Sequence, residues 1–196
     1  MARSTPTRDQ IVAAADRLFY EHGFEHTSFT AIADALGISR GNFYYHFRTK
    51  DEILTAVIES RVESTRGMLR RWETGAADPA ERIRLFIRIV LTNGAEIRDF
   101  GCPVGTLTAE LAKLRHPARP EATALFTLFR RWLAEQFTAL GHASTADEKA
   151  LHVLAFSQGV ATLANAFGDE VFVRREVERL EDWLATELRP AENSPQ

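Results

Sequence analysis

Hydrophobic positions along the chain recur with the spacing of amphipathic helices. In the first expected helix, the apolar residues follow an i, i+3, i+4, i+7, i+8 order, which places one face together: Ile11, Ala14, Ala15, Leu18 and Phe19. Further helices are expected over 30–36, 40–46, 50–72, 80–93, 103–114, 120–140, 146–167 and 172–188. No strand-like alternation bounded by turn residues stands out between them. The pattern therefore predicts an all-α fold of about nine helices.

Turn signals divide this helical chain into parts. Gly37-Ile38-Ser39 separates two short helices, and the segment from Gly75 to Pro79 reads as a linker turn. We expect a three-helix helix-turn-helix domain over residues 1–50, joined to the start of the fourth helix. A second helical domain is expected over 51–190, and a polar, disordered tail over 191–196.

Composition sets limits on the function. Of the 196 residues, 45% are hydrophobic and 26% are charged, which is typical of a globular protein with a real core. The net charge is −3, so a nucleic-acid-binding function cannot rest on global charge. Residues 1–50 carry six Lys or Arg and five Asp or Glu, whereas residues 51–196 carry 18 and 22. The positive balance at the N-terminal end has the sign expected of a DNA-binding head on an acidic body.

Cysteine usage and hydropathy point to a cellular compartment. Cys102 is the single cysteine, so no intrachain disulfide can form, which fits a reducing environment. The first ten residues are polar and lack a signal core, and no stretch is expected to approach a bilayer-spanning run. We therefore expect a cytoplasmic protein without a membrane partner.

The stretch from Thr27 to Asp51 carries the candidate chemistry. Two short helices flank a sharp turn, so the second helix could enter the major groove of DNA. Arg and Asn can read base edges by paired hydrogen bonds, whereas Tyr, His and Lys suit phosphate oxygens. A glycine in the second helix would let its backbone approach DNA closely. The candidate DNA contacts are Ser28, Thr30, Ser39, Arg40, Gly41, Asn42, Tyr44, Tyr45, His46 and Lys50.

The aromatic residues of the second short helix have an alternative role in packing. We expect that role for Phe43 and Phe47, because large aromatic side chains mostly serve packing. Tyr44, Tyr45 and His46 are three polar-tipped neighbours that cannot all face one core, so phosphate contact is expected for them.

The same stretch resembles the signature of the TetR/AcrR family of bacterial regulators. The shared elements are a threonine, an Ile-Ala pair, a Gly-Ile-Ser turn, a Gly-Asn-Phe-Tyr-Tyr-His-Phe run and a Lys-Asp pair: Thr30, Ile32-Ala33, Gly37-Ile38-Ser39, Gly41 to Phe47 and Lys50-Asp51. The run that begins at Gly41 is similar to that of multidrug-sensing, QacR-like members. The resemblance is close over about the first 60 residues, and the remainder agrees in length and helicity.

The resemblance implies a homodimeric transcriptional repressor that binds a near-palindromic operator in double-stranded DNA and is released by a small-molecule effector. Residues 51–190 would then be the effector-binding and dimerisation domain. We expect the 120–140 and 146–167 helices at the dimer interface, although their apolar faces could be intrachain core alone. An apolar pocket would suit a hydrophobic or aromatic effector. The candidate pocket residues, each of which could instead be ordinary core, are Phe86, Phe100, Cys102, Leu107, Trp132 and Phe156.

A second motif lies at Gly101-Cys102-Pro103 and resembles a segment of the LmrA/YxaF-type subfamily. Pro103 suits a first helical turn, which puts Cys102 beside the start of a helix. Cys102 is expected to be a small packing residue; the alternatives are thiol-based redox or electrophile sensing and pocket lining. Glu110, in the same expected helix, should be a solvated carboxylate or face a cationic effector.

Other function classes receive less support from the residues. We find no Gly-rich phosphate loop, nucleophile elbow or metal-spaced histidine cluster, so no enzyme activity, cofactor or metal site is expected. A transcriptional activator remains an alternative to a repressor, because the sequence pattern is the same for both.

Overall fold

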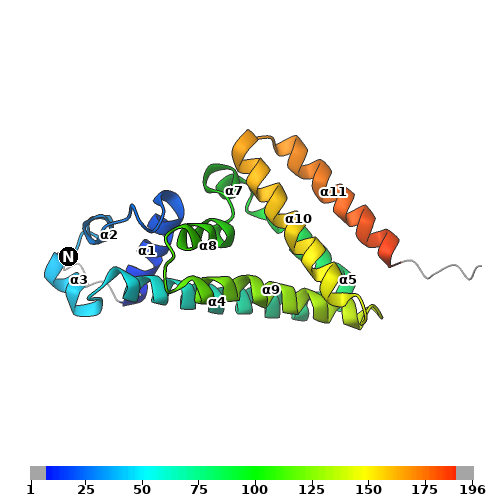
Figure 1. Ribbon diagram of the computed structural model, residues 1–196, viewed down its shortest axis with the longest axis horizontal. Coiled ribbons are helices and arrows are strands. Elements are labelled where there is room, and N and C mark those ends of the chain that lie inside the picture. The colour runs from blue at the N-terminus through cyan, green and yellow to red at the C-terminus, as the bar shows by residue number, and fades with distance from the viewer. Residues whose placement is uncertain (1–7, 189–196) are drawn as a thin grey trace, which may run out of the picture. The chain divides into compact units, whose positions relative to one another are not determined.

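The computed structural model describes residues 8–188, apart from the side chain of Arg40. The expected tail over 191–196 therefore lies outside the described residues. Within the described range all regular structure is helical, and the helices are α1 (Arg8–His22), α2 (Phe29–Leu36), α3 (Arg40–His46), α4 (Lys50–Gly75), α5 (Pro79–Ile87), α6 (Ile89–Thr92), α7 (Gly94–Phe100), α8 (Pro103–Lys113), α9 (Arg119–Ala139), α10 (Ala146–Phe167) and α11 (Glu170–Glu187) (Figure 1). The all-α prediction is confirmed.

Most helix boundaries agree with the sequence expectation to within three residues, but one region differs. The helix expected over 80–93 is broken into α5 and α6, and α7 follows directly where no helix was expected. The chain departs from regular helix at Arg88 and again at Asn93. Asn93 and Gly94 are poor helix formers, which accounts for the second break. If this broken run is counted as one helix, the layout has the nine helices expected.

The chain folds into two compact units that are interleaved along the sequence. One unit holds the chain as far as Met68 together with Pro103–Thr127, and the other holds Leu69–Cys102 together with the chain from Leu128 onward. We call them the N-terminal unit and the C-terminal unit. This division differs from the expected boundary near residue 50, because α8 and the beginning of α9 belong to the N-terminal unit.

The core of the N-terminal unit is built by α1, α2, α3, the first part of α4, and α8. The apolar stripe predicted for the first helix is buried, as are Ile53, Leu54 and Val57 of α4. Leu107 and Leu111 of α8 join the same cluster. A helix that follows residue 100 in sequence thus forms one wall of the domain that carries the helix-turn-helix.

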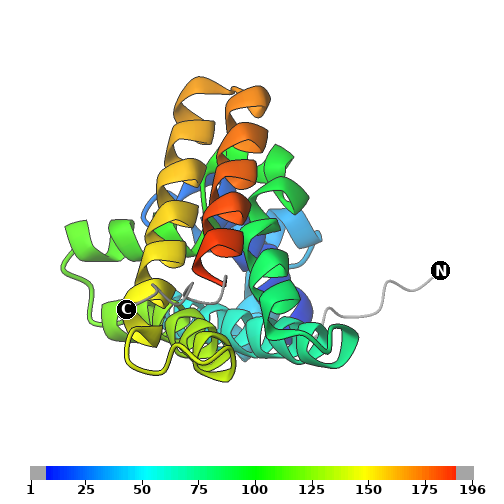
Figure 2. The ribbon, with the colours of Figure 1, turned by 90° about the vertical axis from the view of Figure 1, so that its right-hand side faces the viewer.

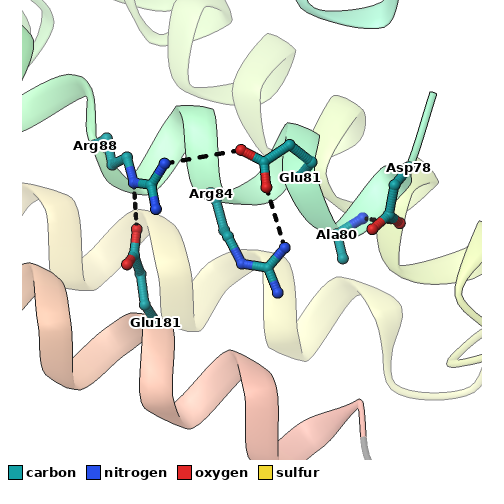
Figure 3. A network of polar contacts seen from close by, with 6 residues as sticks. All are labelled: Asp78, Ala80, Glu81, Arg84, Arg88 and Glu181. Atoms are coloured by element: carbon teal, nitrogen blue, oxygen red, sulfur yellow. Dashed lines mark hydrogen bonds and ion pairs between the residues drawn. The ribbon is translucent and has the colours of Figure 1, made fainter. Parts of the chain in front are cut away.

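The C-terminal unit contains α5, α6, α7, α10 and α11, with the end of α4 and most of α9. α10 and α11 run side by side in both views (Figures 1 and 2). An ion pair joins the end of α5 to α11, because Arg88 Nε donates to Glu181 Oε1 at 2.6 Å. Arg88 Nη1 also lies 3.8 Å from Glu81 Oε1 of α5 itself (Figure 3). The hydrogen bond to Glu181 raises the pKa of the Arg88 guanidinium.

α10 corrects the expectation that no stretch of the chain approaches the length and hydrophobicity of a bilayer-spanning run. Of the described helices, only α10 is long and apolar enough by length and composition to cross a membrane. One of its faces, which includes Val153, Val160 and Ala164, is buried in the C-terminal unit. Such burial is typical of the core helix of a globular domain, which passes the same test.

Candidate nucleic-acid interface

The α2–turn–α3 segment has the local geometry that its sequence predicts. Ser28 is the N-cap of α2 and accepts from the Ala31 N–H at 3.1 Å, and Ser39 caps α3 by accepting from the Asn42 N–H at 3.3 Å. Gly37 ends α2 with φ +64, a left-handed conformation that side chains rarely adopt. Caps and turn therefore fix two short helices in a helix-turn-helix.

The α3 helix has a buried and an exposed side. Phe43 and Phe47 are only 1% and 2% exposed, which confirms their expected packing role. Tyr44 is 50% exposed and Tyr45 is 85% exposed. Tyrosine combines an apolar ring with a hydroxyl group and is enriched at binding interfaces.

The exposed aromatic side of α3 is supported by α2. The Tyr44 ring lies edge-on to the Phe29 ring, with centroids 5.6 Å apart, and Phe29 also contacts Phe43 at 5.0 Å. A shallow cavity of about 250 Å³ lies between the two helices and is lined by Ser28, Phe29, Thr30, Ala33, Phe43 and Tyr44. The surface thus combines hydroxyl groups with fixed aromatic rings, which suits phosphate and sugar contacts.

Gly41 is exposed on the first turn of α3, and the chain itself gives no steric reason for a glycine there. A Cβ atom built at this position would meet nothing within 4 Å. The residue also lacks the positive φ found at Gly37.

The remaining predicted contacts lie around this surface. Asn42 and His46 are half-buried on α3. The His46 ring lies edge-on to the Tyr45 ring, with centroids 5.1 Å apart. The Arg40 side chain lies outside the described residues. The Lys50 ammonium donates to the carbonyl oxygens of Phe24 at 2.9 Å and Glu25 at 3.0 Å, so two of its three donors bind the α1–α2 turn.

Glu110 is a residue whose environment the sequence expectation got wrong. It is neither a freely solvated carboxylate nor directed at an effector, because its oxygens accept from the backbone N–H groups of Phe24 and Glu25, both at 2.9 Å. One signal could have shown this contact. Glu110 lies three residues after Leu107, on the edge of the apolar stripe of α8, where a carboxylate needs a partner.

The six candidate pocket residues do not share one unit. Leu107 is buried in the core of the N-terminal unit, whereas the other five belong to the C-terminal unit. Phe86 packs edge-on against Phe129 at 5.3 Å, and the Trp132 indole N–H donates to Glu73 Oε1 at 2.8 Å. Phe100, Cys102 and Phe156 are half-buried.

Cys102 directly precedes the first residue of α8, as Pro103 predicts. Its sulfur accepts from the Gln158 Nε2 of α10 at 3.5 Å. The thiol is thus half-buried and engaged by a neighbouring amide.

Two family models match separate parts of the chain. Residues 11–57 match the model described as bacterial regulatory proteins, tetR family, and residues 79–176 match the C-terminal domain of LmrA/YxaF-like transcriptional regulators. The chain belongs to the TetR family. The subfamily resemblance drawn from Gly101-Cys102-Pro103 is also confirmed, and the helix-turn-helix of this TetR-family protein is its DNA-binding domain.

Relatives agree with this assignment. The chain is 31% identical over 140 residues to an HTH-type transcriptional regulator in the lacX 3′ region of Lactococcus lactis subsp. lactis. The matched residues cover 68% of this chain and 69% of that protein. It is 27% identical over 146 residues to the HTH-type transcriptional regulator LmrA of Bacillus subtilis (strain 168), with 74% and 76% covered. Both of these relatives of the TetR-family chain are named HTH-type transcriptional regulators.

Solved structures show the same fold. A TetR transcriptional regulator from Legionella pneumophila superposes with a TM-score of 0.80 at 24% identity and covers 96% of this chain and 100% of its own. A TetR-family regulator from Cytophaga hutchinsonii gives a TM-score of 0.80 at 19% identity, covering 95% and 96%. The TetR fold is therefore retained although the sequences have diverged.

Proposed function

We propose that this TetR-family protein is a transcriptional repressor that binds a near-palindromic operator as a homodimer and is released by a small hydrophobic or aromatic effector. The single observation that carries the DNA-binding part is the two-sided α3 helix. Its phenylalanines are buried, whereas Tyr44, Tyr45 and an unobstructed Gly41 are exposed. An α-helix with such a face can lie in the major groove with its backbone close to the DNA.

Phosphate contacts in this proposal come from both helices of the helix-turn-helix. The N-terminal end of α2 offers the Ser28 and Thr30 hydroxyls, and α3 offers Tyr44 and Tyr45. Contacts of this kind fix the register of the helix on the duplex, while Arg40 and Asn42 would read base edges.

A selection experiment tests the DNA-binding function. Full-length protein is used to recover duplexes from a random DNA library, and the enriched sequence is checked for a near-palindrome by footprinting. Tyr44→Phe removes one hydroxyl and should weaken binding of the recovered duplex about two- to tenfold. Glu121→Gln, at an exposed site on α9 away from α2 and α3, serves as the control. Recovery of no enriched duplex would overturn the proposal.

The outer face of α10 supports the homodimer. Exposed apolar and small residues follow one side of this helix: Leu151, Ala155, Gly159, Leu163, Ala166 and Phe167. Phe167 is 73% exposed. On α9, by contrast, most exposed positions are polar or charged, and Arg130 is paired with Asp147 of α10. We therefore place the centre of the interface on α10, with α9 contributing less than the sequence pattern suggested.

Gly159 gives a sharp test of this interface. A Cβ atom at Gly159 would meet nothing within 4 Å in the single chain, so Gly159→Leu should leave each protomer folded. At a close helix-helix contact across a two-fold axis, the added side chain should impair dimerisation. Sedimentation at micromolar concentration measures the outcome, with Gly75→Leu at the equally open end of α4 as the control. A Gly159→Leu dimer as stable as wild type would remove α10 from the interface.

The effector part of the proposal rests on family membership and on the apolar candidates in the chain. Trp132 offers a probe, because its ring lies 5.7 Å from Trp72 and its N–H binds Glu73. A panel of small aromatic compounds can be screened for a change in tryptophan fluorescence. Each compound that changes it is then tested for release of the recovered duplex. A repressor releases DNA with such a compound, whereas an activator binds more tightly.

A further inference from the structure

The turn between α1 and α2 is held by two side chains that lie far away in sequence. The backbone N–H groups of Phe24 and Glu25 both donate to the Glu110 carboxylate, while the carbonyl oxygens of the same two residues both accept from the Lys50 ammonium. The four distances lie between 2.9 and 3.0 Å. A turn without regular secondary structure thus satisfies its backbone through charge-assisted hydrogen bonds.

Gly23 shows that the turn is shaped around this carboxylate. Its φ is +86, and a Cβ atom at this position would lie 3.0 Å from Glu110 Oε1. The backbone conformation strongly favours glycine, and a larger residue would also crowd the Glu110 carboxylate. Thr27, at the other end of the turn, is buried and donates its hydroxyl to the Gly23 carbonyl at 2.7 Å.

The Phe24 side chain ties the same turn into the core. It is buried, and its ring lies edge-on to Phe19 at 5.3 Å and to His116 at 5.2 Å. The Lys50 ammonium lies 4.4 Å from the centre of the Phe24 ring, within the range of a cation–π contact. The turn therefore has one defined position relative to α4 and to the segment that follows α8.

α8 is fixed at both ends, so Glu110 cannot simply follow the turn if the turn moves. At the start of α8, Arg61 of α4 donates to the Pro103 carbonyl at 2.6 Å and also binds Asp16 of α1 at 2.6 Å. After its end, His116 Nε2 lies 3.4 Å from Asp51 Oδ1. Leu107 and Leu111 hold the middle of the helix in the core.

From these contacts we infer that Glu110 is a positioning residue for operator binding, an inference that rests on the proposed function. Glu110 lies outside residues 11–57, which match the TetR DNA-binding model, and has no need to touch DNA. It fixes the turn that leads into Ser28 and the start of α2, and α2 in turn supports Tyr44 through Phe29. The DNA-reading surface is therefore set partly by α8.

The test compares full-length wild type with Glu110→Gln, which keeps the size of the side chain and removes its charge. Binding is measured by fluorescence anisotropy on the duplex recovered by selection with wild-type protein. We expect affinity to fall about tenfold, because two hydrogen bonds to a charged group are weakened. Glu110→Asp, which keeps the charge on a shorter side chain, should recover part of the affinity.

Two further measurements separate positioning from a general loss of structure. Amide hydrogen exchange at Phe24 and Glu25 should be at least about tenfold faster in Glu110→Gln, while exchange in the α10 core stays as in wild type. The salt dependence of binding should keep its slope, because no phosphate contact is removed. Glu121→Gln, an exposed site on α9 in the same unit, makes the same charge change and controls for reduced repulsion of DNA.

The outcomes are distinguishable. Recovery of no duplex by wild type would overturn the proposed function and this inference together. If wild type recovers a duplex and Glu110→Gln binds it equally well, the inference alone is overturned. Weaker binding by Glu110→Gln without faster exchange at Phe24 and Glu25 would also overturn it, because the loss of affinity would then not arise from the turn.

Discussion

Replacement of Gly41 by larger residues separates the demands of the fold from those of DNA binding. Gly41 lies in the first turn of α3 with space around its Cα, and its φ is in the normal helical range. Alanine can adopt this conformation without strain and favours helix over glycine by up to about 1 kcal/mol. For a protein of this size such a gain would raise the Tm by about 2–4 °C.

The same substitution should act in the opposite direction on DNA binding. If the backbone of α3 approaches the duplex at Gly41, one methyl group fills part of that space and a leucine fills all of it. We expect Gly41→Leu to weaken binding of the selected duplex at least about tenfold, which is about 1.4 kcal/mol. Gly41→Ala should show a smaller loss. Both should unfold at or above the wild-type temperature.

Anisotropy titrations and thermal melts on the same samples give the comparison. Gly94→Ala is the matched control, because Gly94 also begins a short helix and a Cβ there meets nothing within 4 Å. This control should keep wild-type DNA affinity. Wild-type affinity of Gly41→Leu would refute the reasoning, since no close contact could then exist at the start of α3.

Other predictions follow from single residues. Arg40→Ala should cost about 1–3 kcal/mol on the selected duplex and relax its sequence preference at one position, which a repeat of the selection would detect. Arg115 has φ +51 at the end of α8, so Arg115→Gly should raise the midpoint of thermal unfolding by relieving a left-handed conformation that costs about 1–2 kcal/mol. The hydrogen bond from Arg130 lowers the pKa of Asp147 below its usual 3.8. The stabilisation from this ion pair is therefore present at pH values above 3.8 and is lost as the pH falls through the lower pKa of Asp147 in the folded state. Asp147→Asn should thus flatten the acid side of the profile of unfolding free energy against pH. Cys102→Ser should bind and release DNA as wild type does, with or without a quinone in the release assay; a quinone response that the serine variant lacks would contradict the packing role.

Local features of the fold could be predicted because their causes are local. Ser28 and Ser39 cap helices through residues three positions later, and Gly37 supplies a left-handed turn within the same short stretch. The division of α3 into packing phenylalanines and outward tyrosines follows from helical periodicity. Each of these inferences needs only a few neighbouring residues, so one sequence contained enough information.

Features set by distant contacts could not be predicted in this way. The sequence pattern placed a domain boundary near residue 50, whereas α8 packs with the helix-turn-helix through Leu107 and Leu111. Similarly, an amphipathic pattern shows that α10 has an apolar outer face but does not show whether another helix of the chain covers it. Periodicity gives the faces of a helix and leaves open which partner each face meets.

Glu110 and Gly23 show how such a long-range contact can be recognised from paired anomalies. A carboxylate on the edge of the apolar stripe of α8 needs hydrogen-bond donors, and a turn entered by a left-handed glycine has backbone N–H groups without a regular partner. Each anomaly alone has several explanations, since an acid can reach solvent and a turn can bind water. Together they are complementary in charge and in hydrogen-bonding capacity, and the separation of 86 positions between Phe24 and Glu110 in sequence does not prevent contact. If Glu110 positions the turn as inferred, a change that moves α8 has a direct route to the turn before α2 within the N-terminal unit.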